Sequence, residues 1–278
     1  MARRLSPIGA HVSAAGGLLR ALPRAEQIGA ETMQVFVSSP RAWAPPAADP
    51  EGDSAFRSAC ELPVFVHAPY LINFGSPSPE TLAHSCDALG FALRRGAAIG
   101  ARGVVVHAGS AVLGLRRDEA LAQVRASVLP LLDSVEDCPR LLIEPTAGGG
   151  GALASDASSL GAYLDALGRD ERVGVCLDTC HMHAAGHDLS TGFAAALRDF
   201  ARAAGRGAIG LVHVNDSRDP AGSKRDRHES IGHGTIGRDA FAALFTTTGL
   251  RGVPLVVETA EADHATDIAT LKALRAAG

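Results

Sequence analysis

A chain of 278 residues that is 46% hydrophobic and 20% charged has an ordinary globular composition, which argues against disorder. A single α/β barrel typically takes roughly 250 residues, so we expect one domain that spans residues 1–278. No apolar stretch approaches the roughly 20 residues of a membrane span, and the amino-terminal stretch has no signal-peptide core, so we expect a cytoplasmic protein.

Short runs of aliphatic and β-branched residues recur along the chain, each followed by a Gly-, Pro- or Ser-rich loop and then a helical pattern. The predicted strands are Ile8–Val12, Thr32–Val37, Leu62–Ala68, Gly103–His107, Arg140–Glu144, Val173–Asp178, Ile209–Asn215 and Val253–Thr259. Predicted helices include Pro79–Ile99, which Ser78 would cap, and Asp118–Val135.

Eight apolar strands that alternate with helices indicate parallel strands covered on both faces and favour a closed (β/α)8 TIM barrel. An open doubly wound sheet would be favoured by a glycine-rich turn after the first strand. The turn at Gly16–Gly17 lacks the G-x-G-x-x-G spacing of such a fold, so the barrel is preferred.

Nearly every predicted strand ends in a residue that can bind a metal. These residues are His11, His67, His107, Glu144, Asp178, His213 and Glu258. In a barrel the carboxyl ends of the strands meet at the face where barrel enzymes place their chemistry. A lone histidine or carboxylate at a strand end is usually structural. Several together in one poorly hydrated mouth need neutralising charge, and bound cations would supply it.

Two loops add further candidate ligands. Asp178 and His181 lie three residues apart where a strand passes into a loop, close enough to face one pocket or two adjacent metals. His183 and His187 follow them, and we expect these two to lie behind the ligands or at the surface.

The second loop carries Asp226 and His228 on either side of Arg227. In extended backbone the two outer side chains point the same way and the arginine points oppositely. The alternative is a solvated charged turn. Imidazoles and carboxylates together suit zinc, manganese or iron.

The five cysteines are an odd number, scattered through a chain too large to need disulfides, so we expect them to be reduced. Cys176 lies inside an apolar strand, and Cys180 follows without a second cysteine pair. Packing roles are therefore expected for both.

The formal net charge of −4 argues against a general nucleic-acid binder. Divalent cations bound at the barrel mouth would offset this charge and concentrate positive charge at the mouth.

Seven stretches resemble the endonuclease IV family in order and spacing. They are IGAHVSAAGG, VHAPYLINFGSP, EPTAGGG, VGVCLDTCHMHAAGHD, LVHVNDS, RDRHESIGHGTIG and VVETA, and they extend from Ile8 to the last helix. The resemblance implies three zinc ions per chain, with manganese or iron as alternatives at some sites. The implied ligand sets are His67, His107 and Glu144; then Glu144, Asp178, His213 and Glu258; then His181, Asp226 and His228.

The resemblance further implies a DNA-repair endonuclease that cleaves double-stranded DNA 5′ to abasic sites, leaving a 3′-hydroxyl and a 5′-deoxyribose phosphate, and that removes blocking groups from 3′ ends. Catalytic roles would fall to Glu144, Glu258 and His181. A monomer without an obligate protein partner, acting on the bacterial nucleoid, is expected.

The family kinks the duplex and flips the abasic sugar out, which costs less than extruding an intact nucleotide. Arg41 matches the family's arginine that enters the base stack, and Tyr70 and Leu71 match the side chains that fill the gap. Trp43 is expected to pack beneath the arginine loop.

The chain departs from the family pattern at three places. Ser38–Pro40 replaces longer polar or basic side chains, Pro145 replaces an asparagine, and His233 stands where an acidic residue is common. We expect the first departure to affect DNA binding rather than chemistry, and His233 to be exposed.

The main alternative is a sugar isomerase or epimerase of the xylose-isomerase-like superfamily, which shares the barrel and a metal set of the Glu144, Asp178, His213 and Glu258 type. Such an enzyme uses one or two metals. It would not need the five further candidate ligands, which are His67, His107, His181, Asp226 and His228. A DNA-binding or zinc-storage module without activity would need neither bridged metals nor a barrel mouth.

Overall fold

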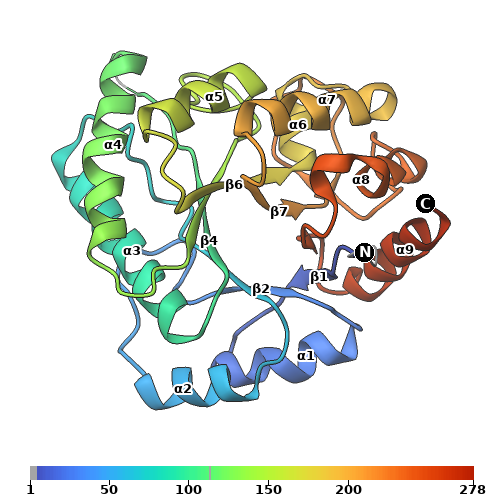
Figure 1. Ribbon diagram of the computed structural model, residues 1–278, viewed down its shortest axis with the longest axis horizontal. Coiled ribbons are helices and arrows are strands. Elements are labelled where there is room, and N and C mark those ends of the chain that lie inside the picture. Colours follow the sequence, from blue (N-terminus) through green and yellow to red (C-terminus); the bar gives the residue numbers. More distant parts are fainter. Residues whose placement is uncertain (1–4, 113) are drawn as a thin grey trace.

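The computed structural model describes residues 5–112 and 114–278 and contains a closed barrel of eight parallel strands in the order β1-β10-β7-β6-β5-β4-β3-β2. Figure 1 looks along the barrel and shows the helices arranged around it. The predicted TIM barrel is therefore confirmed. The first four residues of the amino-terminal stretch considered above lie outside the described part of the chain.

The barrel strands are β1 (Ile8–His11), β2 (Met33–Phe36), β3 (Val64–His67), β4 (Gly103–His107), β5 (Arg140–Glu144), β6 (Val173–Asp178), β7 (Ile209–His213) and β10 (Leu255–Val257). Three of them, β4, β5 and β6, have the predicted bounds. The others are shorter than predicted by one to four residues.

The helices are α1 (Ala21–Gln27), α2 (Pro50–Ala59), α3 (Pro79–Ala98), α4 (Arg117–Asp133), α5 (Ala157–Ala166), α6 (Thr179–Ala185), α7 (Leu189–Ala204), α8 (Ala243–Thr246) and α9 (His264–Ala277). Short 3-10 helices occur at Leu18–Arg20, Arg238–Ala242 and Thr248–Leu250. As predicted, Ser78 caps α3 by accepting a hydrogen bond from the Thr81 N–H (3.3 Å), and Pro79 occupies its first position. Among the described residues, none of the helices has the length and apolar character to cross a bilayer.

The barrel interior is filled by a small apolar cluster of six side chains: Phe65, Val105, Leu142, Cys176, Leu211 and Val256. Leu142 fits because Gly103 and Gly210 face it: a Cβ on Gly210 would lie 2.8 Å from its side chain. A larger cluster fills the space between strands and helices. The dry floor of the barrel leaves polar side chains to occupy the layer above it, toward the carboxyl ends of the strands.

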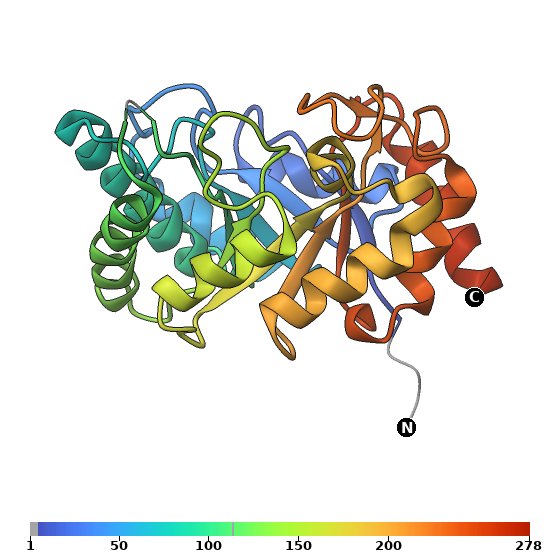
Figure 2. The ribbon, with the colours of Figure 1, turned by 90° about the horizontal axis from the view of Figure 1, so that it is seen from above.

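A two-stranded antiparallel hairpin, β8 (Asp216–Ser217) and β9 (His228–Glu229), rises beyond β7 and was not predicted. In the side view of Figure 2 the long connecting loops gather along the upper rim of the barrel. The hairpin is pinned to α6, because the Gly222 N–H donates to the His183 carbonyl (3.0 Å) and the Lys224 N–H to the Ala184 carbonyl (3.0 Å).

Candidate metal centre

Five imidazoles and four carboxylates meet at the mouth of the barrel. They belong to His67, His107, Glu144, Asp178, His181, His213, Asp226, His228 and Glu258. Barrel strands end at or just before six of them, α6 carries His181, and the hairpin carries Asp226 and His228. The structure therefore brings together all nine side chains that the family resemblance singled out.

The first group surrounds one oxygen of Glu144. Glu144 Oε2 lies 3.4 Å from His67 Nε2 and 3.6 Å from His107 Nε2. These residues end three neighbouring strands, β3, β4 and β5, whose parallel register brings their last side chains together. The group can hold one metal ion.

The second group uses the other oxygen of Glu144. His213 Nδ1 lies 3.1 Å from Glu144 Oε1, 3.2 Å from Glu258 Oε2 and 4.0 Å from Asp178 Oδ2. Glu144 is 1% exposed and separates the first group from the second, so its carboxylate is placed to bridge two ions.

The third group joins α6 to the hairpin. Asp226 lies 3.1 Å from His181 Nε2 through one oxygen and 3.0 Å from His228 Nε2 through the other. Asp178 Oδ2 also comes within 3.6 Å of His228 Nε2, so Asp178 stands between the second and third groups. Arg227 points away and pairs with Asp219, as the extended spacing predicted.

The chemistry of these donors fits bound cations. The Nδ1–H of His67 donates to the Ala68 carbonyl (2.7 Å), which leaves a lone pair on Nε2 facing a carboxylate. Two buried atoms, Glu144 Oε2 and His228 Nε2, lie 3.0–3.6 Å from other ligand atoms but make no contact of hydrogen-bond geometry with the described residues. Ligand atoms at ~2.1 Å from a tetrahedral ion lie ~3.4 Å apart. The separations of 3.1–3.6 Å between the paired ligand atoms are close to this value.

The buried carboxylates and imidazoles also shift one another's pKa values. Burial opposes ionisation of Glu144, but His213 and the other nearby imidazoles outweigh it and hold its pKa well below the usual range. For Asp178, burial wins and raises the pKa. Burial disfavours charge on His228, but Asp178 and Asp226 raise its pKa to about 9. The imidazoles and carboxylates thus interact strongly, and bound cations would take over the neutralising role of the protonated imidazoles.

Two polar residues behind the ligands were not predicted. The Asn215 side-chain amide donates to Asp178 Oδ2 (2.7 Å), and its oxygen accepts from the Glu258 N–H (2.8 Å). Gln34 contacts Glu258 and His213. Both residues are fully buried. The sequence feature that could have identified them is a polar side chain in or next to an apolar strand.

Three other histidines, His183, His187 and His233, have structural or surface positions. His183 is buried, and its Nδ1 accepts from the Leu189 N–H (3.2 Å). His187 packs edge-on against Phe200, with 5.2 Å between ring centroids. His233 is exposed, as expected.

The two buried cysteines are packed thiols. Burial raises the pKa of both Cys176 and Cys180 to about 12, although Cys176 lies near Glu144 and His213 and Cys180 near Asp226 and His228. All five cysteines are free, as predicted. Pro145, which replaces the family's asparagine, contributes its carbonyl, which accepts from His181 Nδ1 (3.1 Å).

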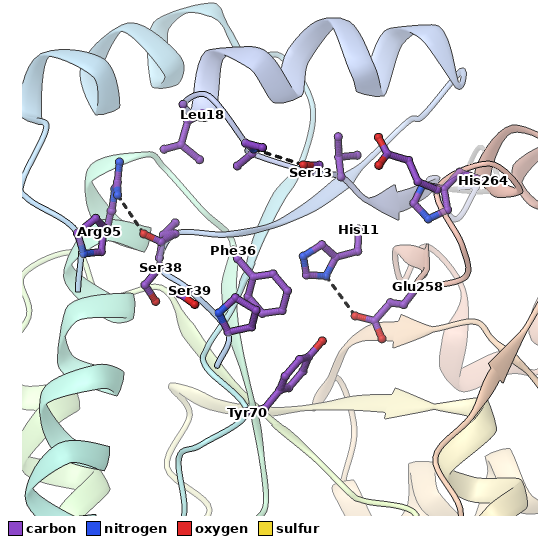
Figure 3. Close-up of a pocket in the computed structure, with 18 of the residues that line it drawn as sticks. His11, Ser13, Leu18, Phe36, Ser38, Ser39, Tyr70, Arg95, Glu258 and His264 are labelled. Carbon is purple, nitrogen blue, oxygen red and sulfur yellow. Dashed lines mark hydrogen bonds and ion pairs between the residues drawn. The ribbon is translucent and has the colours of Figure 1, made fainter. Parts of the chain in front are cut away.

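Two cavities flank the ligands. The larger, of about 760 Å³, lies between the loops after β1 and β2 and the β10–α9 loop, and Figure 3 shows His11, Phe36, Tyr70 and Glu258 converging on it. The other, of about 470 Å³, lies over the glycine-rich loop Gly148–Gly151. Proposed ligands line both cavities, with His228 and Glu258 in the larger and His107 in the other.

The predicted DNA-reading side chains lie on the rim of this mouth. Tyr70 and Leu71 are 45% and 37% exposed, unusual for large apolar residues, and the Tyr70 ring lies 5.5 Å from that of His107. Arg41 is exposed, on a loop joined to Tyr70 by the hydrogen bond from the Tyr70 N–H to the Pro40 carbonyl (3.0 Å). Trp43 is half-buried, and its ring lies tilted against that of His84 of α3, with 5.2 Å between the ring centroids.

Comparison with known proteins gives the family. The family of the xylose isomerase-like TIM barrel matches residues 22–275. The probable endonuclease 4 of Streptomyces coelicolor is 51% identical over 97% of this chain and 95% of its own, and that of Streptomyces avermitilis is 49% identical over 97% and 90%. The crystal structure of endonuclease IV from Thermus thermophilus is 31% identical, with a TM-score of 0.86 over 98% of this chain and 100% of its own. An L-ribulose 3-epimerase, 18% identical with a TM-score of 0.71 over 98% and 97% of the two chains, shares the fold alone. The chain belongs to the endonuclease IV family of AP endonucleases, as its motifs predicted.

Proposed function

We propose that this protein uses three zinc ions to hydrolyse the phosphodiester bond 5′ to abasic sites in double-stranded DNA, leaving a 3′-hydroxyl and a 5′-deoxyribose phosphate. One observation carries the proposal: nine imidazole and carboxylate ligands converge in three groups, two of which share Glu144. Bridged metal ions a few ångströms apart are typical of enzymes that hydrolyse phosphate esters. The relatives named endonuclease 4 support the same assignment.

We assign one zinc site to each of the three ligand groups. The first zinc would be held by His67, His107 and Glu144, the second by Glu144, Asp178, His213 and Glu258, and the third by His181, Asp226 and His228. Manganese or iron suits the same nitrogen and oxygen donors, so one or more sites can accept them.

When bound, the ions lower the pKa of water toward neutrality and neutralise charge that develops on the phosphate. The protein's part is to hold the ligands. We assign direct roles to Glu144, Glu258 and His181. Glu144 presents one oxygen to each of two groups, Glu258 lines the larger cavity, and His181 lies 3.2 Å from Glu144 and so connects the third group to the others.

Selection of the lesion falls to the rim. Tyr70 and Leu71 present apolar surface next to the ligands, where they can occupy the gap that a missing base leaves in the stack. Arg41 is exposed on the neighbouring loop, from which it can enter the duplex, and Trp43 packs the same loop against His84 of α3. Blocked 3′ ends would reach the same ions, so we include removal of 3′ blocking groups in the proposed activity.

We also propose that the enzyme acts as a monomer on the bacterial nucleoid in the cytoplasm, because all nine ligands come from one chain.

Two measurements test the proposal. Metal analysis of the purified protein should give about three zinc ions per chain. A 5′-labelled duplex with one synthetic abasic residue should be cut once, immediately 5′ to the lesion, and a polymerase should extend the product. The same duplex with an intact nucleotide is the control. Fully metallated protein that leaves the abasic duplex uncut would refute the proposal, and a single bound metal with activity on ketoses would favour the isomerase alternative.

A further inference from the structure

We propose that Gln34 is a positioning residue for the second zinc site. It fixes which nitrogen of His213 carries the proton, and it holds Oε1 of Glu258, the carboxylate oxygen that does not face His213 Nδ1. The inference rests on the zinc centre proposed above, because His213 and Glu258 are two of the ligands assigned to that site. It concerns a side chain on β2, a strand that contributes none of the nine ligands.

Gln34 is fully buried and uses its whole amide at the site. Its Nε2 lies 2.7 Å from Glu258 Oε1 and 2.9 Å from His11 Nδ1, and its Oε1 lies 2.9 Å from His213 Nε2. The three contacts reach residues on β1, on β7 and directly after β10. No other polar atom in the side chain is left to satisfy, so the amide is held in one orientation.

The orientation of this amide follows from its partner. An ionised carboxylate only accepts hydrogen bonds, so the face of Gln34 toward Glu258 must be the NH2 group. The amide oxygen therefore faces His213, and His213 Nε2 must carry a proton in order to donate to it. A neutral imidazole then has its lone pair on Nδ1, the atom 3.1 Å from Glu144 and 3.2 Å from Glu258.

The same amide also determines which oxygen of Glu258 faces the ligand cluster. Oε1 accepts from Gln34, whereas Oε2 lies 3.2 Å from His213 Nδ1, on the side of the ligand cluster. One side chain thus turns two ligands toward one point. Hydrogen bonds of this kind behind metal ligands typically contribute 10–100-fold to metal affinity.

A role in packing alone does not account for the residue. Its neighbours along β2, Met33 and Val35, are fully buried and apolar, and a methionine would fill the space of Gln34 without placing an amide in a dry strand. Among the described residues, the side-chain amide contacts two proposed ligands and His11.

The test is the variant Gln34→Met, which keeps the size of the side chain and removes all three contacts. After dialysis against a zinc chelator at a concentration where wild-type protein keeps three ions, the variant should keep two, and titration should show one site weakened 10–100-fold. Zinc-induced stabilisation against heat should shrink in the same variant. The matched control is Thr32→Val, which removes a buried hydrogen bond to the Pro63 carbonyl (2.9 Å) two residues earlier and should keep all three ions.

A second measurement needs no variant. In zinc-loaded wild-type protein, nitrogen NMR of His213 should show a protonated Nε2 and a metal-bound Nδ1, and a proton-free Nε2 would overturn the proposal. Three ions and an unchanged isotherm in Gln34→Met would overturn it as well. Wild-type protein with fewer than three ions would instead refute the zinc centre itself, so the two failures are distinguishable.

Discussion

Replacing the shared carboxylate should do more damage than removing either histidine of the first group. In Glu144→Gln the side chain keeps its shape but loses the charge that faces four imidazoles within 3.6 Å. Removing one partner of a buried ion pair costs roughly 3–5 kcal/mol, and roughly 1.4 kcal/mol is a factor of ten in affinity. Each of the two bridged ions should therefore bind roughly 10²- to 10³-fold more weakly.

His107→Ala should weaken only the first ion, and by less, because the His107 side chain is 22% exposed and water can take its place. The assay is zinc retention in a chelator gradient, followed by single-turnover incision of an abasic duplex. Glu261→Gln removes an exposed carboxylate from the larger cavity and serves as the matched control. Equal losses in Glu144→Gln, His67→Ala and His107→Ala would contradict the bridging role.

Three further outcomes are expected. The pKa of His228 is raised to about 9 in the metal-free protein, and a zinc ion must displace that proton, so zinc affinity measured by chelator competition should rise from pH 6 to pH 9; a flat profile would argue against His228 as a ligand. Burial acts to raise the pKa of Glu31, but hydrogen bonds from Arg275 and from the Ile8 N–H outweigh burial and lower this pKa to about 2. Because the folded pKa is depressed, this stabilisation is present above about pH 4.5 and is lost as the pH falls toward 2. Glu31→Gln should lower the free energy of unfolding in urea by roughly 1 kcal/mol at pH 7. An unchanged urea midpoint would show that the ion pair between Glu31 and Arg275 of α9 does not stabilise the fold. Tyr70→Ala should weaken binding of abasic DNA by roughly 1–3 kcal/mol in a fluorescence titration while all three zinc ions stay bound; zinc loss would mean that Tyr70 supports the metal centre instead.

The sequence predicted the bounds of a barrel strand correctly where the residues of that strand alone determine where it begins and ends. β4, β5 and β6 are apolar runs with clear boundaries, and their bounds are as predicted. β10 is shorter than Val253–Thr259 for two local reasons: Pro254 has no N–H for the ladder, and the Glu258 N–H donates to the Asn215 side chain instead of a strand.

What the sequence could not predict depends on distant partners. The β8–β9 hairpin has two residues in each strand, too few for any periodic signal, and its pairing joins Ser217 to His228 across a long loop. Gln34 could be noticed as a polar residue in an apolar strand, but its partners Glu258 and His213 are 224 and 179 positions away. The ligand groups came from resemblance, since spacing alone does not say which strand ends share an ion.

The convergence of strand ends at Glu144 also affects the order in which the barrel forms and the ions bind. Proposed ligands of the first two ions extend from His67 to Glu258, so the two ions bridged by Glu144 would together connect segments separated by most of the sequence, as a cross-link does. Such a cross-link can form only after β3 and β10 have found their places, because the loop entropy must be overcome first. The ions would then lock a barrel that already exists, and amide exchange at the strand ends should slow on zinc addition while exchange around the interior Leu142 changes little.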